Sequence, residues 1–411
     1  MKKIYQTTAL AAGMLCMVAT SPAFAGSASD LETMKRQMQE VIVQNQQLTK
    51  RIAEMEKGLK MQEEKIAETS DLRASQTELD EGNDLSNMIS KYVSFGGAIE
   101  VETGWSEDFD GVSSSSIDLA TAEFAFEAQL SDWAMGVMAI EWDGDEDKIS
   151  IDEAFINVGN MDEVPVYLQA GRYIVPFGIY EGNTISDPLT KEVFETKEDA
   201  VMVGFESNGF YANAYVFNGE TNEGGGDDTI EHFGGNLGYR LNNDDMAFGT
   251  SIDLVNSVFD SDGLTDAFAG SDGFMGDDGI MVEGDPGSLE SDYAAGLAVH
   301  AIFGMGGFGI IGEYITALDE VDGVEPKAWQ VEGFYEMEIA GKGVIFSLGY
   351  SETDELGGVF PESRIAAVVG IGLLDELGLT VEYTHDEDYD SSEGGTDESA
   401  DAVTVQLAYE F

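Results

Sequence analysis

The chain has 411 residues, and its 80 acidic and 19 basic residues give a formal net charge of −61 at pH 7. This charge excludes nucleic acid as a partner, because phosphate binding requires an excess of Lys and Arg. A hydrophobic share of 43% and an aromatic share of 10% argue against a disordered acidic chain and predict a folded body.

The first 25 residues have the pattern of a cleavable secretory signal. Lys2 and Lys3 precede an apolar stretch at 8–20, and a small-residue cleavage site follows at 23–25. The stretch is too short for a membrane-spanning helix, and no later window approaches the roughly 20 apolar residues that such a helix needs. The single cysteine, Cys16, lies within this signal, so the mature chain has no disulfide and no thiolate metal ligand. We therefore expect an exported protein, and any membrane-spanning part must be a β-barrel.

Residues 26–70 carry a heptad pattern, followed by a polar linker at 71–91. The core positions alternate three and four residues apart over about five heptads, which predicts a coiled-coil stalk of roughly 54 Å rather than a lone amphipathic helix. Asn45 occupies a core position, where a buried Asn commonly fixes the register and the number of strands. The core positions are Leu31, Met34, Met38, Val41, Asn45, Leu48, Ile52, Met55, Leu59, Gln62 and Ile66.

From residue 92 to 411 the hydrophobic period changes to two, and the sequence predicts about sixteen antiparallel strands. Tight links after even strands alternate with longer acidic links after odd strands, as expected for the periplasmic turns and external loops of an outer-membrane barrel. The predicted class is therefore an all-β transmembrane β-barrel preceded by an α-helical coiled coil. The strands are predicted to begin near Tyr92, Ile117, Ala134, Ile149, Pro165, Ala200, Phe210, Ile230, Met246, Tyr293, Phe308, Lys327, Gly343, Arg364, Leu379 and Ala402.

The last strand separates an apolar face from a polar one and ends on an aromatic residue. Leu407, Tyr409 and Phe411 lie on the apolar face, and their spacing resembles the signal read by the barrel-assembly machinery. A soluble sandwich also alternates, but it buries its apolar face and does not need so many strands without a break. We expect a bacterial outer-membrane location, with lipid around the barrel and the stalk in the periplasm.

Two long links after odd strands are candidates to narrow the pore. Residues 175–199 are partly apolar and carry mixed charges, so we predict a constriction loop that folds into the lumen. Residues 259–291 are rich in Gly and Asp, and we predict a solvated external lid there. The residues that mark the constriction loop are Pro176, Phe177, Gly178, Asp187, Pro188, Lys191, Glu192, Glu195, Lys197 and Glu198.

Side-chain parity predicts which polar residues face the lumen. One hypothesis is that these carboxylates concentrate cations and exclude anions, and the alternative is that they only keep the lumen wet. Arg172 falls on the lipid side by parity, which predicts either a local bulge or a subunit contact. The lumen-facing set is Glu100, Glu102, Glu123, Glu127, Glu141, Glu153, His232, Asp253, His300, Glu313, Gln330, Glu332, Glu336 and Glu382.

Two short stretches resemble a known family of porins. Gly171-Arg172 with Pro176-Phe177-Gly178 resembles the phosphate-selective porin superfamily, and 185–190 with 195–200 is similar to the LbtU-type siderophore porins. The resemblance implies an outer-membrane porin with a periplasmic coiled coil and a role in ferric-siderophore uptake. Nine basic residues after Arg73 are too few for the Arg and Lys ladder of the phosphate porins, so phosphate selectivity is disfavoured.

The sequence supports no metal site, cofactor or catalytic centre. Residues 143–154 fail the EF-hand template, because Lys148 replaces its Gly and Ala154 its Glu. His232, His300 and His385 are far apart in sequence, and no motif marks a serine nucleophile near His385, the one rim candidate for a barrel hydrolase.

We therefore predict a porin, not an enzyme, that lets small solutes or iron chelates diffuse passively. The predicted assembly is a homotrimer whose stalk would meet peptidoglycan. The rival interpretations are a structural protein that tethers the envelope through its coiled coil and an outer-membrane barrel hydrolase with His385 at its rim.

Overall fold

The computed structural model describes residues 92–143, 148–219, 229–243, 246–269, 274–275, 281–282, 293–320 and 323–411. The predicted signal peptide, stalk, Asn45 and linker lie outside these residues. Among the residues described, no helix combines the length and apolar character needed to cross a membrane.

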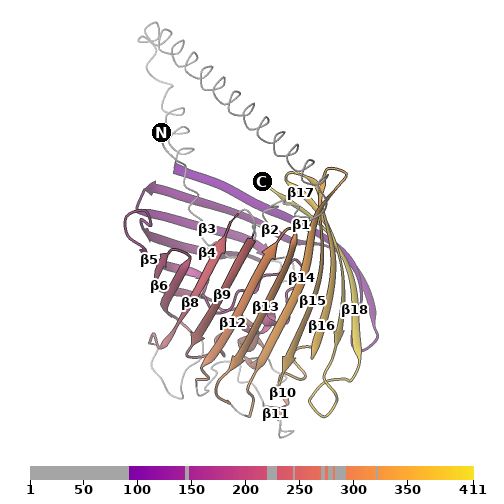
Figure 1. Ribbon diagram of the computed structural model, residues 1–411. Coiled ribbons are helices and arrows are strands. Elements are labelled where there is room, and N and C mark those ends of the chain that lie inside the picture. Colours follow the sequence, from indigo (N-terminus) through magenta and orange to yellow (C-terminus); the bar gives the residue numbers. More distant parts are fainter. Residues whose placement is uncertain are drawn as a thin grey trace, which may run out of the picture. The chain divides into compact units, whose positions relative to one another are not determined.

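Sixteen strands form a closed antiparallel barrel (Figure 1). Each strand pairs with its neighbours in the sequence, and β1 closes the ring against β18 with Ala98 opposite Glu410 and Glu107 opposite Asp401. A two-stranded piece, β10 (Phe274–Met275) with β11 (Met281–Val282), stands apart from the ring. The barrel strands are β1 (Val93–Glu107), β2 (Ser113–Ser131), β3 (Ala134–Asp143), β4 (Lys148–Gly159), β5 (Val166–Ile174), β6 (Lys197–Ser207), β7 (Phe210–Phe217), β8 (His232–Asn242), β9 (Met246–Val255), β12 (Gly296–Met305), β13 (Phe308–Ala317), β14 (Lys327–Ile339), β15 (Lys342–Asp354), β16 (Ser363–Leu374), β17 (Leu377–Glu387) and β18 (Ser399–Glu410).

The prediction of a sixteen-stranded barrel is confirmed. The largest difference in a strand start is at β2, which begins at Ser113 rather than near Ile117. β6 begins at Lys197 rather than Ala200, because Ile174 pairs with Lys197 and the β5–β6 ladder continues beyond the predicted end.

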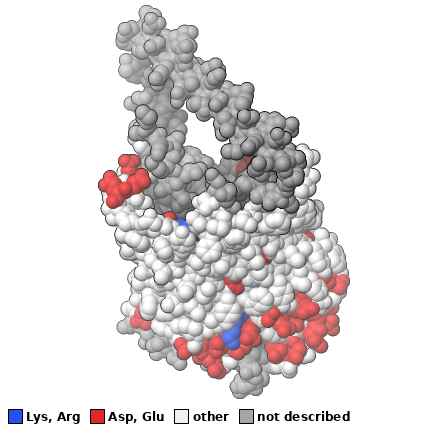
Figure 2. Space-filling view, in the orientation of Figure 1, with Lys and Arg blue, Asp and Glu red and all other residues white. Residues whose placement is uncertain are grey.

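Apolar and polar residues alternate along the strands, which gives the barrel wall two chemically different faces. On β9, Ile252 and Leu254 are 56% and 51% exposed, whereas Asp253 between them is 0% exposed. An apolar outer face and a polar inner face are what a membrane barrel requires, because lipid surrounds it and water fills it. In Figure 2 the middle of the wall is free of charge over most of its height, and most of the acidic side chains in view gather at the end that carries β10 and β11 in Figure 1.

Short turns join the strands at the end of the barrel where β18 finishes, which we call the turn end. Asn208-Gly209, Gly306-Gly307 and Ala340-Gly341 are two-residue connections in which both residues have positive φ. This is the type I′ geometry, whose twist matches that of the paired strands. The longer connections, including those after β5 and β9, lie at the opposite loop end (Figure 1).

Candidate functional site: a loop inside the barrel

The connection between β5 and β6, residues 175–196, folds into the barrel; we call it the inner loop. It contains the short helix α3 (Leu189–Phe194), which contacts β13, β14 and β15. The loop is shorter than the predicted 175–199, since Lys197 and Glu198 belong to β6. Its hydrogen bonds to several strands across the ring define its path along the inner wall.

The first part of the inner loop is held by carboxylates of β9 and β13. The Gly178 backbone N–H donates to Asp253 Oδ2 at 3.0 Å, and the Ile179 N–H donates to Glu313 Oε1 at 2.6 Å. Asp253 and Glu313 are buried, at 0% and 4% exposed. A loop inside a barrel has no neighbouring strand to accept its N–H groups, so these wall carboxylates take that role.

The second part is held in the same way by β14 and β17. Glu332 accepts the Asn183 backbone N–H at 3.0 Å, and Glu382 accepts the N–H groups of Ile185 at 2.7 Å and Ser186 at 2.9 Å. The Ser186 hydroxyl also donates to Glu382. Hydrogen bonds to charged groups contribute about 1.5–3 kcal/mol each, so this set of anchors is strong enough to keep the loop on the wall.

An arginine fixes the loop segment around α3. Arg364 on β16 donates from Nη2 to Asp386 Oδ2 on β17 at 2.8 Å and from Nη1 to the Asp187 backbone carbonyl at 2.9 Å. Its Nη1 also contacts the Glu192 carboxylate on α3. Arg364 therefore ties the inner loop to two adjacent strands of the wall.

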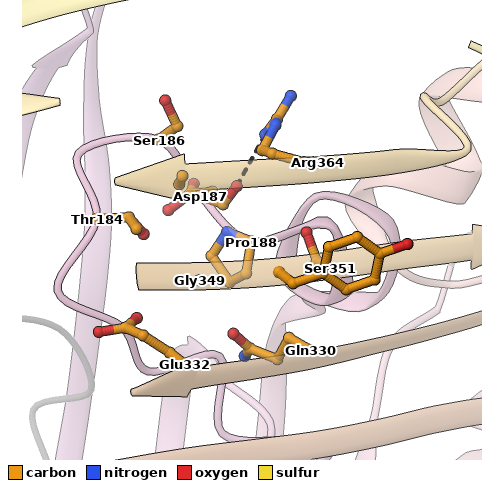
Figure 3. Close-up of a pocket in the computed structure, with 11 residues that line it drawn as sticks. Thr184, Ser186, Asp187, Pro188, Gln330, Glu332, Gly349, Ser351 and Arg364 are labelled. Carbon is orange, nitrogen blue, oxygen red and sulfur yellow. Dashed lines mark hydrogen bonds between the residues drawn. The ribbon is translucent and has the colours of Figure 1, made fainter. Parts of the chain in front are cut away.

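A small polar pocket lies between the loop and this wall. Figure 3 shows Asp187 and Pro188 of the loop beside Ser351 and Arg364 of the wall. The lining residues are Thr184, Ser186, Asp187, Pro188, Gln330, Glu332, Gly349, Tyr350, Ser351, Arg364 and Ala366. The pocket lies where the loop segment that precedes α3 runs along β14, β15 and β16.

Apolar side chains fill the space beneath the loop at the loop end. Phe177 and Phe194 of the inner loop pack in one buried cluster with Phe259 and Leu264 from the connection after β9. Phe259, Asp260, Ser261 and Leu264 are buried, and the prediction of a solvated lid is wrong for these residues of 259–291. Much of its Asp-rich remainder lies outside the described residues.

Hydrogen bonds also join the two long connections. Ser261 Oγ donates to the Val193 carbonyl at 2.7 Å, and the Asp262 backbone N–H donates to the Glu195 carbonyl at 2.8 Å. Asp262 begins the helix α4 (Asp262–Ala269), which contacts α3. The two connections thus form a common structure within the barrel.

Charged groups on α3 and its C-terminal end are arranged in opposing pairs. Burial raises the pKa of the Glu192 carboxyl, and the Arg364 guanidinium opposes that shift. Burial likewise raises the pKa of Glu195, which Lys191 and Lys197 oppose. Lys191 Nζ lies 3.0 Å from Asp187 Oδ1 and 4.0 Å from Glu195 Oε2, so Lys191 offsets part of the negative charge of the loop, and Arg364 and Lys197 of the wall offset more.

The remaining residues of the predicted lumen-facing set differ in their surroundings. His232 Nδ1 lies 2.8 Å from Asp260 Oδ2, and His300 Nδ1 lies 3.8 Å from Asp253 Oδ2. The buried members are Glu100, Glu153, His232, Asp253, His300, Glu313, Gln330, Glu332 and Glu382, and the half-buried members are Glu102, Glu123, Glu127, Glu141 and Glu336.

Other predicted positions lie on the outer face. Arg172 lies there with its Nε 3.0 Å from Asp199 Oδ1, and both side chains are about half exposed. Tyr409 and Phe411 are exposed and stack with ring centroids 5.9 Å apart. His385 Nδ1 lies 2.9 Å from Asp401 Oδ1. Within the described part of the chain, no cluster of three or more His, Cys, Asp or Glu side chains is arranged to hold a metal.

Sequence reasoning missed the roles of Arg364 and Ser351. Ser351 Oγ accepts the Leu189 backbone N–H at 3.4 Å, next to the Arg364 contacts. The sequence did contain a signal for Arg364, because it is a basic residue at an inward-facing position of β16. A positive charge at such a position requires acidic partners nearby.

Two sets of known proteins are similar to this chain, and the first set consists of sequence relatives. No protein-family model matches the chain. The chain is 27% identical over 315 residues to a UPF0422 protein of Coxiella burnetii, covering 72% of this chain and 64% of that protein. It is 25% identical over 334 residues to UPF0422 protein lpg2959 of Legionella pneumophila, covering 72% and 62%. The chain thus spans less than two thirds of the length of these relatives.

Solved structures of porins are similar to the barrel. An anion-selective porin from Comamonas acidovorans matches with a TM-score of 0.55 and 13% identity, covering 78% of this chain and 99% of that one. OprB of Pseudomonas putida matches with a TM-score of 0.56 and 11% identity, covering 81% and 97%. The outer-membrane channel DcaP of Acinetobacter baumannii matches with a TM-score of 0.53 and 12% identity, covering 78% and 97%. The chain has the fold of the sixteen-stranded porins.

Proposed function

We propose that this protein is a porin of the bacterial outer membrane through which small solutes diffuse passively. One observation carries the proposal: a closed sixteen-stranded barrel holds a loop anchored along its inner wall. A barrel of this size encloses an aqueous channel, and a loop fixed inside it sets the width of that channel. The apolar outer face suits a lipid surrounding.

The charge of the chain favours cations over anions in this channel. The nine basic residues after Arg73 face a large excess of carboxylates. Such a lumen attracts cations and repels anions, in contrast to the neighbour described as anion-selective. Ferric siderophores, the cargo implied by the resemblance to LbtU-type porins, enter this proposal as one class of solute.

We further propose a homotrimer with a periplasmic stalk. The Arg172–Asp199 pair supports a subunit contact, because it lies on a face that is otherwise apolar. Charged side chains on the lipid face of a barrel are destabilising, by an amount that falls from about 2–4 kcal/mol at the bilayer midplane towards the interfaces, and a protein partner would lower that cost. The heptad pattern at 26–70 supports the stalk, and a stalk in the periplasm would be positioned to meet peptidoglycan.

Planar-bilayer recording on the full-length mature chain tests the proposed function. We expect stepwise conductance in KCl and a reversal potential in a KCl gradient that indicates cation preference. A chain that inserts without conducting would contradict the channel and favour the structural tether. Conductance with anion preference would contradict the cation selectivity alone.

A further inference from the structure

Two groups of carboxylates on the inner face have different surroundings. Those of β9, β13, β14 and β17 accept hydrogen bonds from the inner loop, as described above. Those of β2, β3 and β4 lie on another part of the wall, where no backbone N–H group of the inner loop bonds to them within the described structure. This second group is the acid wall, made of Glu123, Glu141, Asp152 and Glu153.

The strand register brings the acid wall together. Glu123 on β2 lies directly opposite Glu141 on β3, and Glu153 on β4 lies opposite Ala139, two residues from Glu141 on the same face. A register shift between β3 and β4 leaves Asp152 as an extra residue beside Glu153. Like charges at directly opposite positions repel each other, so this register concentrates negative charge on this part of the wall.

Lys197 at the start of β6 supplies one positive charge next to the acid wall. Its Nζ contacts Asp152 Oδ1. The ionisable groups that act on Glu153 are Asp152, Glu123 and Glu195, which are acidic, and Lys197. One cation therefore faces several carboxylates, and its hydrogen bond is made to Asp152 rather than Glu153.

Glu153 itself is 5% exposed, and no side chain or backbone group in the described part of the chain makes a hydrogen bond or an ion pair with it. A buried carboxylate without a partner is costly, and the usual remedy is a cation that also donates hydrogen bonds. The acid wall therefore places several carboxylates next to Glu153, which is 5% exposed and has no hydrogen-bond donor in the described part of the chain.

We propose that the acid wall binds the positively charged end of small organic solutes that carry an ammonium or guanidinium group. This proposal rests on the proposed channel function and names the class of solute that the channel selects. The planar guanidinium suits the site because its fork of N–H donors can bond the Glu153 carboxylate through two hydrogen bonds. Glu153 on β4 would be the principal acceptor, and Glu123, two strands away on β2, would add negative charge to the site.

Block of the potassium current by agmatine tests this site in the full-length mature chain. Agmatine carries a guanidinium and an ammonium group, and glutarate, an anion of similar length, is the control solute. We expect agmatine to block and glutarate not to block. Glu153→Gln should raise the half-blocking concentration of agmatine by about tenfold, which corresponds to about 1.4 kcal/mol. Glu123→Gln should raise it by a smaller factor.

Glu336→Gln on β14 is the matched control variant, because it removes an inner-face carboxylate outside the acid wall and should leave the block unchanged. Conductance without agmatine block, or equal block in the wild type and Glu153→Gln, would overturn the site while leaving the channel intact. If the wild type does not conduct, the channel proposal fails, and titration calorimetry of the detergent-solubilised chain with agmatine decides the site. Binding that is lost in Glu153→Gln supports it, and absence of binding overturns it.

Discussion

At the scale of single residues, the turn between β14 and β15 carries an unusual strain. Ala340 has a φ of 54°, in the left-handed region that side chains with a Cβ atom disfavour. The other two type I′ turns described above use Asn-Gly and Gly-Gly, which adopt positive φ more easily. The alanine is therefore tolerated because the strands on either side determine the geometry of the turn.

We predict that Ala340→Gly stabilises the barrel by about 1 kcal/mol, because glycine adopts this φ without a steric penalty. Urea-dependent folding of the chain into lipid vesicles measures the change. Gly341→Ala is the matched control: a Cβ at that position would meet no atom within 4 Å, so it adds only backbone strain at a φ of 80° and should destabilise the barrel. Equal stability of all three chains would contradict this account.

At the scale of elements, the inner loop and its anchors form the central unit of the site. Glu382 illustrates the arrangement, because one carboxylate accepts two consecutive backbone N–H groups and a hydroxyl. A neutral amide has the same shape but only one acceptor oxygen. Its NH₂ group would face an N–H donor of the loop.

We predict that Glu382→Gln loosens the inner loop and costs about 1–3 kcal/mol, since one buried donor loses its acceptor. Single-channel recording should show larger current fluctuations than in the wild type. Glu338→Gln, which changes an exposed carboxylate on β14, is the control and should behave like the wild type. If the current fluctuations of Glu382→Gln were no larger than those of Glu338→Gln, the proposed anchoring role of Glu382 would be wrong.

The strands could be predicted from the sequence, whereas the anchors could not. Because lipid contacts one face of the wall and water the other, apolar and polar residues alternate within each strand. The sequence around Asp253 therefore already shows which residues of β9 lie on the outer face and which on the inner face. The partner of Asp253 is Gly178, 75 residues away, and the partners of Glu382 are nearly 200 residues away. Such pairings depend on how the ring closes and on where the loop turns inward. The same reason explains why Phe259 and Leu264 were assigned to a solvated lid although they pack beneath the loop.

At the scale of the whole molecule, the outer face is uniform except for a few charged positions. Arg172 and Asp199 come from adjacent strands of the ring and pair with each other on that face. In a monomer this pair would meet lipid or headgroups, and in an oligomer it would meet protein.

We predict that Arg172→Ala lowers the association constant of the oligomer by on the order of tenfold, because Asp199 is left without its partner at the contact. Native mass spectrometry of the detergent-solubilised full-length chain measures the oligomer fraction. Arg240→Ala, which breaks a pair with Glu206 of comparable exposure, is the control. An unchanged oligomer fraction in Arg172→Ala would place the contact elsewhere.

The seam between β1 and β18 has a consequence for biogenesis. These strands come from opposite ends of the barrel sequence, and their pairing is the step that converts an open ribbon into a ring. Residues 175–196 are tethered at both ends and packed against the inside of that ring. Closure of this seam therefore completes the wall around residues 175–196, so the pairing of the first and last strands also encloses the loop.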